Sequence, residues 1–336
     1  MQRKASQADV ARLAGVSVTT VNLVLNQSRS ARISAATAQR VQAAAQQLGY
    51  STDAIGRMLR TGESRSLGFV SNNVTTTRYA SLMISGVLNA AEQQGYTVLI
   101  AEAESHQLQR TLASLQERRV DGLLFGFMQA RQVDIPDLKQ QRAVLINGVS
   151  NGLPSLLPDE YAAGVNAIEC LLAHNHQRIG VIGRNHKAKD PYHSVTIESR
   201  FAGIDDAMRN AGLCLAGEVH GDEWEPSLGY QGTLTLLDSG ADITALLVAN
   251  DRIAFGAYRA LHERGLRVAD DISIISFDDE PLAGYMHPTL TTLQLPYYEM
   301  GKLAVERLLS MDSAPSHATC QRVAMPLIER ESVRRL

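Results

Sequence analysis

The first 66 residues contain the side chains best suited to binding a polyanion. They include nine Lys or Arg and three Asp or Glu, a net charge of +6, whereas the rest of the chain has a net charge of −9. A basic segment attached to an acidic body is typical of a protein that binds nucleic acid. A solvated surface that happens to be basic would carry the same charge, so the motifs of this segment must decide between the two.

Three polar residues of the body carry complementary hydrogen-bonding groups. Arg200 offers a planar fork of donors, Asp278 accepts hydrogen bonds from two hydroxyls, and Asn250 both donates and accepts. Asn250 and Asp278 each end an apolar run, and Arg200 precedes a helical pattern. Groups of these kinds complement the vicinal hydroxyls of a polyol wherever a fold brings them together.

The sequence contains no pattern typical of an enzyme or a metal site. It has no G-x-G-x-x-G that opens a helix, no Walker A motif and no G-x-S-x-G elbow. His174 and His176 form an isolated H-x-H without a third ligand at metal spacing, so we expect a solvated helix end there. The three cysteines are far apart and odd in number, which predicts reduced thiols. We expect no cofactor and no metal.

The length and the apolar runs limit the possible classes further. A chain of 336 residues predicts two or three domains. No apolar run reaches the ~18 residues of a membrane span, and residues 1–6 lead into no hydrophobic stretch of a secretory signal. We therefore expect a cytoplasmic protein with no membrane segment.

Local signals predict two short helices in the basic segment. Ser6 and Asp9 have the spacing of a capping box for a helix over residues 6–14, and Gly15 can end that helix in a left-handed conformation. Its predicted apolar stripe is Val10, Leu13 and Ala14. Ser17 can cap a second helix, Val18 to Leu25. Two short helices around a tight glycine turn in a basic segment are typical of a helix-turn-helix.

The second helix has two distinct faces, and a third helix follows it. The residues of the second helix that can face inward are Val21, Val24 and Leu25. Those that remain to face outward are Val18, Thr19, Asn22 and Leu23. The third helix begins at Ser34, and Gly49 closes it. Its apolar face consists of Val41, Ala44, Ala45 and Leu48.

From Ser66 onward, apolar strand patterns alternate with helical patterns. The strand patterns are 67–70, 98–101, 122–127, 143–146, 179–182, 246–249 and 272–277. The helical patterns are 79–94, 105–118, 162–174, 201–211, 228–238, 252–264 and 297–309. This alternation predicts open parallel sheets with helices on both faces, whose ligands bind beyond the carboxyl ends of the strands.

The ordered motifs resemble one family over almost the whole chain. Residues 9–26 and 41–50 resemble the start of the LacI/GalR family of transcriptional regulators. The stretches 247–251, 254–257, 271–279, 288–292 and 296–301 resemble its effector domain, which is similar to two-lobed periplasmic sugar-binding proteins. The resemblance implies a small all-α helix-turn-helix head and an α/β two-lobed periplasmic-binding-protein-like body with parallel sheets.

The resemblance also implies which residues contact DNA. These are Val18, Thr19 and Leu23 at base edges in the major groove, and Ser17, Thr20 and Asn26 near phosphates. Asn22 and Leu23 stand where the family usually has Ser and Arg. A leucine can make only apolar contact with a base, such as with a thymine methyl group. Packing of Val18 or Leu23 on a neighbouring helix is the alternative.

The segment after the head resembles the hinge helix of the family, which inserts a leucine into the minor groove. Leu59 holds the leucine position and Arg60 the adjacent basic position. Gly56 replaces an alanine, which costs roughly 1 kcal/mol in a helix interior. We therefore expect a helix that forms only on DNA and beside its twin. An inert linker is the alternative.

In the body, the resemblance implies an effector site at the ends of several strands. Its candidate residues are Tyr79, Asn147, Arg200, Trp224, Asn250 and Asp278. Trp224 aligns with an aromatic residue that stacks on the effector, and a place in the core is its alternative. Asp251 is expected to cap its helix. The basic loop 184–193 could meet a sugar acid or phosphate, and a solvated loop is an equally good interpretation.

These observations predict three segments: a helix-turn-helix DNA-binding domain (1–51), a hinge helix and linker (52–65), and an effector-binding and dimerisation domain (66–336). We expect a ligand-responsive, homodimeric transcriptional repressor. Its partners would be near-palindromic double-stranded operator DNA and a small effector: a sugar, sugar acid or sugar phosphate. A sugar-modifying enzyme and a solute-binding protein are the alternatives.

Overall fold

The computed structural model describes residues 5–25, 33–50, 58, 62–72, 80–104, 106–311 and 319–336. The chain divides into two compact units, Met1–Ser64 and Arg65–Leu336. Each unit has its own buried core. No single helix in the described ranges is long and apolar enough to cross a membrane, and α1 and α2 of the first unit (Gln7–Ala14 and Val18–Leu25) meet that test only as a pair bent by 102°.

The described part of the first unit contains the helices α1, α2 and α3 (Ala35–Gln47). The capping box of α1 is confirmed, because Ser6 Oγ accepts a hydrogen bond from the Asp9 amide at 3.3 Å and Asp9 Oδ2 accepts one from the Ser6 amide at 3.0 Å. Gly15 has a φ of 64°, as its place after α1 requires. The three helices pack around a core that includes Val10, Val21 and Val41.

The predicted apolar stripe of α1 is wrong at one position. Leu13 is 47 % exposed, whereas Ala11 is buried with Val10 and Ala14. Ala11 and Leu13 lie on opposite sides of the line through Val10 and Ala14. The neighbouring helices cover the alanine side, because a methyl group allows closer approach than an isobutyl group does.

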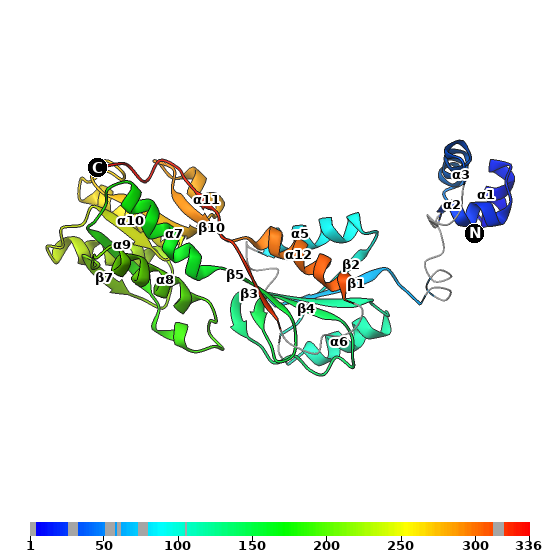
Figure 1. Ribbon diagram of the computed structural model, residues 1–336, viewed down its shortest axis with the longest axis horizontal. Helices are drawn as coiled ribbons and strands as arrows, with labels where there is room; N and C mark the ends of the chain where they lie inside the picture. Colours follow the sequence, from blue (N-terminus) through cyan, green and yellow to red (C-terminus); the bar gives the residue numbers. More distant parts are fainter. Residues whose placement is uncertain are drawn as a thin grey trace. The chain divides into compact units, whose positions relative to one another are not determined.

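The second unit contains two six-stranded sheets (Figure 1). The strand order of the first is β11-β5-β4-β3-β1-β2, and that of the second is β12-β10-β9-β8-β6-β7. Neighbouring strands pair in parallel except β10 and β12, which pair antiparallel. The predicted α/β body with parallel sheets is confirmed.

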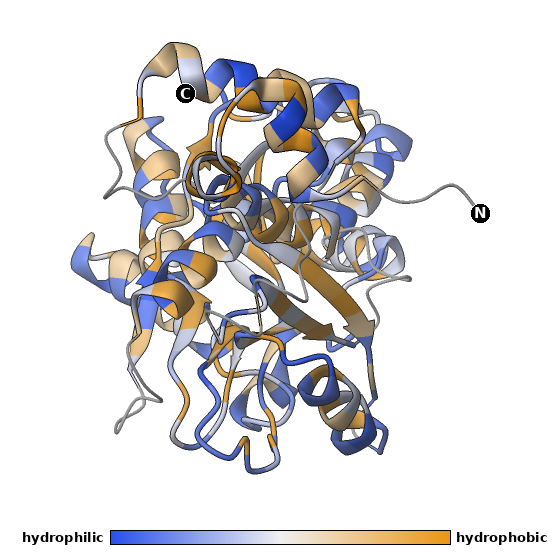
Figure 2. Cartoon of the chain, turned by 90° about the vertical axis from the view of Figure 1, so that its right-hand side faces the viewer, coloured by the Kyte–Doolittle hydropathy of each residue, from blue (hydrophilic) through white to orange (hydrophobic). Residues whose placement is uncertain are grey.

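Each sheet forms the centre of one lobe. The first lobe contains strands β1 (Ser66–Ser71), β2 (Thr97–Glu102), β3 (Gly122–Gln132), β4 (Ala143–Val149), β5 (Ser155–Pro158) and β11 (Cys320–Val323). Its helices are α5 (Ala80–Gln93), α6 (Leu108–Glu117) and α12 (Tyr297–Ser310). Residues of α5 and α12 pack on one face of the sheet and residues of α6 on the other. In Figure 2, strands in the interior are coloured largely as hydrophobic residues.

The second lobe contains strands β6 (Ile179–Arg184), β7 (Gly217–His220), β8 (Ala245–Val248), β9 (Ser273–Asp278), β10 (Thr291–Gln294) and β12 (Leu327–Ile328). Its helices are α7 (Glu160–Ala173), η1 (His186–Lys189), α8 (Ile197–Asn210), α9 (Pro226–Asp238), α10 (Asp251–Glu263) and α11 (Pro281–Tyr285). The alternating pattern missed β5, β7, β10, β11 and β12, which have two to four residues, although it found β8, which also has four.

The described chain crosses between the lobes at three places. It crosses after β5 to enter α7, after β10 to enter α12, and after β11 to reach β12. The parallel strands of both sheets therefore direct their carboxyl ends toward the boundary between the lobes, where ligands of such folds bind.

Candidate functional site

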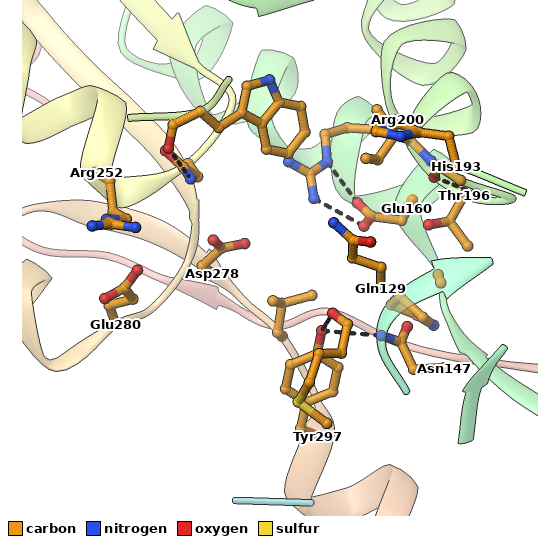
Figure 3. Close-up of a pocket in the computed structure, with 18 residues that line it drawn as sticks. Gln129, Asn147, Glu160, His193, Thr196, Arg200, Arg252, Asp278, Glu280 and Tyr297 are labelled. Carbon is orange, nitrogen blue, oxygen red and sulfur yellow. Dashed lines mark hydrogen bonds and ion pairs between the residues drawn. The ribbon is translucent and has the colours of Figure 1, made fainter. Parts of the chain in front are cut away.

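A cavity of about 480 Å³ lies between the two lobes of the second unit (Figure 3). Both lobes line it, and the residues come from the ends of β4, β5, β8 and β9 and from the starts of α7, α8 and α12. Of the predicted effector residues, it brings together Asn147, Arg200, Trp224, Asn250 and Asp278. Tyr79 lies outside the described residues.

Arg200 is held in the cavity wall by a buried ion pair. Its side chain is 2 % exposed, and its Nε and one terminal nitrogen donate to the two carboxylate oxygens of Glu160 at 2.6 and 2.8 Å. The other terminal nitrogen donates to the carbonyl of Ala249 at 2.6 Å. Burial alone lowers the pKa of Arg200, but the Glu160 carboxylate outweighs burial and the pKa lies above its usual value.

This arrangement changes what Arg200 can offer to a ligand. Three of its five N–H groups donate to Glu160 and Ala249. These bonds use only one N–H of each terminal nitrogen, and the second N–H of each can donate to a ligand. Glu160 was not predicted from the sequence. It lies 40 residues before Arg200, and no local spacing connects the two.

The residue that caps α10 is Asn250, and not Asp251 as the sequence predicts. Asn250 is the N-cap of α10, because its Oδ1 accepts a hydrogen bond from the Ile253 amide at 2.8 Å. Its Nδ2 donates to the carbonyl of Trp224 at 3.2 Å. The expectation that Asp251 caps the helix is therefore wrong. Asn250 still lines the cavity, and its amide also ties α10 to the segment that carries Trp224.

Asp251 is fully buried and joins three elements beneath the cavity. Its carboxylate accepts hydrogen bonds from Ser276 of β9, from Thr292 of β10 at 2.8 Å and from the amide of Glu280 at 2.6 Å. Burial raises the pKa of Asp251 to about 6, although these three donors oppose the shift. The turn at residues 278–280, which lines the cavity, is thereby fixed from below.

Asp278 ends β9 with an unusual backbone conformation. Its φ is 107° and that of Asp279 is 55°, and residues other than glycine rarely adopt positive φ values. Asp279 makes an ion pair with Arg330 at 2.6 Å. The turn directs the Asp278 carboxylate into the cavity, on the same side as Arg252 and Glu280 (Figure 3).

Trp224 lies at the edge of the core and at the cavity. It is half-buried, packs against the core of the second lobe and also lines the cavity. Its Nε1 donates to the carbonyl of Gly183 at 2.8 Å, and the guanidinium of Arg200 lies 5.3 Å from its ring centroid. The indole is therefore held in one orientation with part of its surface on the cavity.

The described residues of the wall from the first lobe include no charged side chain, and its polar groups come from Gln129, Asn147 and Tyr297. Asn147 is buried with a φ of 58°, and its Nδ2 donates to the carbonyl of Phe127 at 2.9 Å and to the hydroxyl of Tyr297 at 3.2 Å. Burial raises the pKa of Tyr297, so this hydroxyl stays protonated. Tyr297 and Gln129 line the cavity and were not predicted from the sequence.

In the first unit, α2 presents the predicted DNA-contacting residues. Ser17 Oγ accepts a hydrogen bond from the Thr20 amide at 3.1 Å, which confirms the predicted cap. Ser17, Val18 and Thr19 are exposed, Asn22 and Leu23 are half-buried, and Val21 and Val24 are buried. Val18 and Thr19 are thus free to meet another molecule. Asn26, Leu59 and Arg60 lie outside the described residues.

No group of three or more His, Cys, Asp or Glu side chains in the described ranges could hold a metal ion. His174 and His176 do not form a common solvated end. His176 is buried, and its ring contacts Thr244 Oγ1 at 3.1 Å and the carbonyl of Arg334 at 2.8 Å. Burial lowers its pKa. Its role is to hold the C-terminal segment against the second lobe.

Comparison with known proteins connects both units to one group. Residues 8–53 match bacterial regulatory proteins of the lacI family, and residues 168–333 match a periplasmic binding protein-like domain. The chain is 31 % identical to the ribose operon repressor of Escherichia coli K12 over 322 residues, which cover 93 % of this chain and 94 % of that protein. It is 32 % identical to the transcriptional repressor PurR of Haemophilus influenzae over 341 residues, which cover 97 % and 98 %.

A solved structure is similar over nearly the full length. The lac repressor dimer bound to operator and the anti-inducer ONPF has a TM-score of 0.69 and 26 % identity, with 99 % of this chain and 100 % of that chain covered.

Proposed function

Because the chain belongs to the LacI family of bacterial regulatory proteins, and is thus a DNA-binding transcriptional regulator and not an enzyme, we propose that it is a cytoplasmic homodimeric repressor controlled by a sugar or sugar derivative. The ribose operon repressor and the lac repressor dimer on its operator support this assignment. The proposed segments are the DNA-binding domain 1–51, the hinge 52–65 and the effector and dimerisation domain 66–336.

The observation that carries the proposal is the cavity between the lobes. It collects a donor fork, a mixed amide and a carboxylate beside an indole, and these groups come from α8, from the ends of β8 and β9 and from the segment between β7 and α9. Hydroxyl groups pair with such donors and acceptors, and the C–H face of a sugar ring packs on an aromatic surface. Asn147, Arg200, Trp224, Asn250 and Asp278 are the proposed effector contacts.

The connections between the lobes explain how a ligand could alter the rest of the protein. Three crossing segments join the lobes, and Pro158 and Tyr297 beside two of them line the cavity. A ligand that contacts both walls favours one angle between the lobes, and it shifts the equilibrium by its differential affinity for the two states. Effector and operator must then influence each other's affinity by the same factor.

In the first unit, the exposed side of α2 is the proposed DNA surface. Its contacts are proposed to be Val18, Thr19 and Leu23 with bases and Ser17, Thr20 and Asn26 near phosphates. Asn22 is a further proposed DNA contact, and Leu59 and Arg60 are proposed to act in the minor groove. Each subunit of a dimer would present one such helix to a half-site, so the operator should be near-palindromic.

One experiment tests the proposal directly. The operator is selected from random DNA with the full-length protein, and sugars are then screened for a change in operator affinity and in the fluorescence of Trp224, the single tryptophan. A sugar that changes both signals supports the proposal. Selection of no preferred sequence, or a preferred sequence whose affinity no sugar changes, would contradict it.

A further inference from the structure

The charged residues of the cavity are unequally balanced. Three carboxylates line it, those of Glu160, Asp278 and Glu280, against the two arginines Arg200 and Arg252. Full protonation of His193, the other basic side chain among the described lining residues, would only equalise the two signs. Among the described lining residues, the carboxylates thus outnumber the arginines by one.

Both arginines already have a carboxylate partner from the protein itself. Arg200 makes the buried ion pair with Glu160, and Arg252 makes an ion pair with Glu225 at 2.7 Å. Asp278 also lies close enough to Arg200 to help raise its pKa. A phosphate or carboxylate of a ligand would have to compete with these internal carboxylates for each arginine.

The helix N-termini at the cavity are also occupied by acids. A helix N-terminus carries a partial positive charge that attracts anions. α7 has Glu160 in its first turn, α8 has Glu198 and α10 has Asp251. The positive ends that could bind an anionic ligand are therefore compensated by the chain itself.

In the basic loop 184–193, His193 lines the cavity, but the arginine and the two lysines do not. Arg184 forms ion pairs with Asp205 at 2.7 Å and with Glu218, and Lys187 forms one with Asp222 at 3.3 Å. Arg184, Lys187 and Lys189, all of which the structure describes, are absent from the lining of the cavity. The loop instead contacts the first lobe through its backbone, because the Gln132 amide donates to the carbonyl of Pro191 at 2.7 Å.

A neighbouring cavity of the first lobe has the same excess of acids. It has a volume of about 570 Å³, and Gln129 lines both cavities. Its charged lining residues are Glu104 and Asp134 against Arg131, with His106 3.5 Å from Glu104. Extension of a ligand into this space would not provide an excess of positive charge either.

We infer that the effector of this protein carries no negative charge, so that it is a neutral or amino-bearing sugar rather than a sugar acid or a sugar phosphate. The inference rests on the proposed function, because it assumes that the cavity binds a sugar. Glu160, Asp278 and Glu280 accept hydrogen bonds from hydroxyl or ammonium groups, and they repel phosphate and carboxylate groups.

The test uses matched sets of sugars with the full-length protein. Each set contains a neutral pentose or hexose, its phosphate, its aldonic acid and its amino derivative, and binding is measured by calorimetry and by Trp224 fluorescence. We expect the neutral or amino member of the binding set to bind at least about tenfold more tightly than its phosphate and its acid. Tighter binding of a phosphate or an acid than of its neutral parent would overturn the inference.

A pair of variants separates charge from shape. Glu225→Gln releases Arg252 from its ion pair, so we expect it to improve phosphate binding relative to neutral-sugar binding by about tenfold. Glu223→Gln, a matched control, makes the same charge change at an exposed residue outside the cavity lining and should leave the ratio unchanged. If both variants change the ratio of phosphate to neutral-sugar affinity equally, the ion pair of Arg252 does not control the charge that the cavity accepts.

Inorganic phosphate provides a probe that does not depend on knowing the sugar. We expect millimolar phosphate to leave the melting of the second unit of the wild-type protein unchanged. Stabilisation by phosphate that is lost in Arg252→Gln or Arg131→Gln would overturn the inference. Failure of every sugar to bind would contradict the proposed function, and the phosphate measurement would still decide the sign of the charge that the cavity accepts.

Discussion

The two binding regions of this protein carry opposite charge. The contacts that stabilise each region also join residues at different separations along the chain. The segment that contains the first unit is strongly basic, whereas the cavity of the second unit contains more carboxylates than arginines. The caps of the first unit join residues three positions apart, such as Ser6 with Asp9. The cavity depends on pairs such as Glu160 with Arg200 and Asp251 with Thr292, which are 40 and 41 residues apart.

This difference follows from what each region has to recognise. A polyanion is attracted by net positive charge on an exposed surface, and most of that attraction needs no fixed geometry. A small neutral ligand offers only a few hydrogen-bonding groups, so the protein must hold its own groups in place beforehand. Buried ion pairs and hydrogen bonds provide that rigidity in the second unit.

The largest expected effect tests the contrast in charge. If the basic heads of a dimer neutralise ~6–10 phosphates, operator affinity should fall by about 10³–10⁵-fold between 50 and 200 mM salt. Binding of a neutral sugar in the cavity should change little over the same range, because no ions need to be released. Fluorescence anisotropy of labelled operator and Trp224 fluorescence measure the two in parallel. Equal salt dependence of both would remove the contrast.

The second prediction concerns the buried ion pair. Arg200→Ala leaves the Glu160 carboxylate buried without its cation, so we expect the second unit to lose about 3–5 kcal/mol of unfolding free energy, and effector binding to be lost. From residue types alone, one would expect this variant to lose effector response without loss of stability. The ion pair changes that expectation.

A double variant separates the two effects of Arg200. Replacement of both partners by apolar residues, Glu160→Leu with Arg200→Met, should recover most of the stability but not the effector binding. Urea unfolding followed by Trp224 fluorescence provides the stability, and calorimetry provides the binding. Recovery of binding in the double variant would show that neither side chain recognises the ligand.

The same comparison explains which features the sequence could predict. The predicted caps at Ser6 and Ser17 and the bounds of α2 were correct, because local spacing determines them. The alternating body and its parallel sheets were also predictable from the periodicity of the apolar residues. Local propensity failed where packing decided between neighbouring residues, as at Leu13 and Ala11.

The cavity was predictable only in part. Arg200, Asn250 and Asp278 could be proposed because their positions match a family pattern, and the structure brings them together. Glu160, the partner of Arg200, and Tyr297, the partner of Asn147, could not be predicted, because each comes from a crossing segment that meets the site only after folding. Asp251 was assigned as a cap because it follows a strand, yet the adjacent Asn250 holds that position.

The third prediction concerns Asp251 and the pH dependence of stability. Burial raises its pKa to about 6 in the folded protein. Between about pH 4 and pH 6 the folded protein therefore retains a proton that the unfolded chain has lost. The stability of the wild-type protein should fall relative to Asp251→Asn as the pH rises across this window, by an amount on the order of 3 kcal/mol, and then stay constant.

The measurement is urea unfolding of both proteins across this pH range, with Trp224 as the probe of the second unit. The opposite trend is informative. If the hydrogen bonds from Ser276, Thr292 and the Glu280 amide dominate over burial, the folded pKa is lowered. The stability of the wild type relative to Asp251→Asn then rises as the pH increases toward about 4 and stays constant above it.

The smallest expected effect concerns Asp278, the predicted carboxylate that faces the cavity. Asp278→Asn preserves the shape of the side chain but removes its charge and half of its acceptor capacity. Poorly paired ligand hydroxyls cost about 1–3 kcal/mol each, so effector affinity should fall by roughly 5–100-fold while operator binding without effector stays near the wild-type value.

The neighbouring residue supplies the control for this last change. Asp279→Asn removes a carboxylate of equal charge that is paired with Arg330 at 2.6 Å and does not line the cavity between the lobes. It should lower stability more than effector affinity, whereas Asp278→Asn should do the reverse. Calorimetric titration with the effector and thermal unfolding of both variants measure the contrast. If the two variants lose effector affinity equally, Asp278 acts through the shape of the turn at residues 278–280, because loss of a direct contact would affect only one of them.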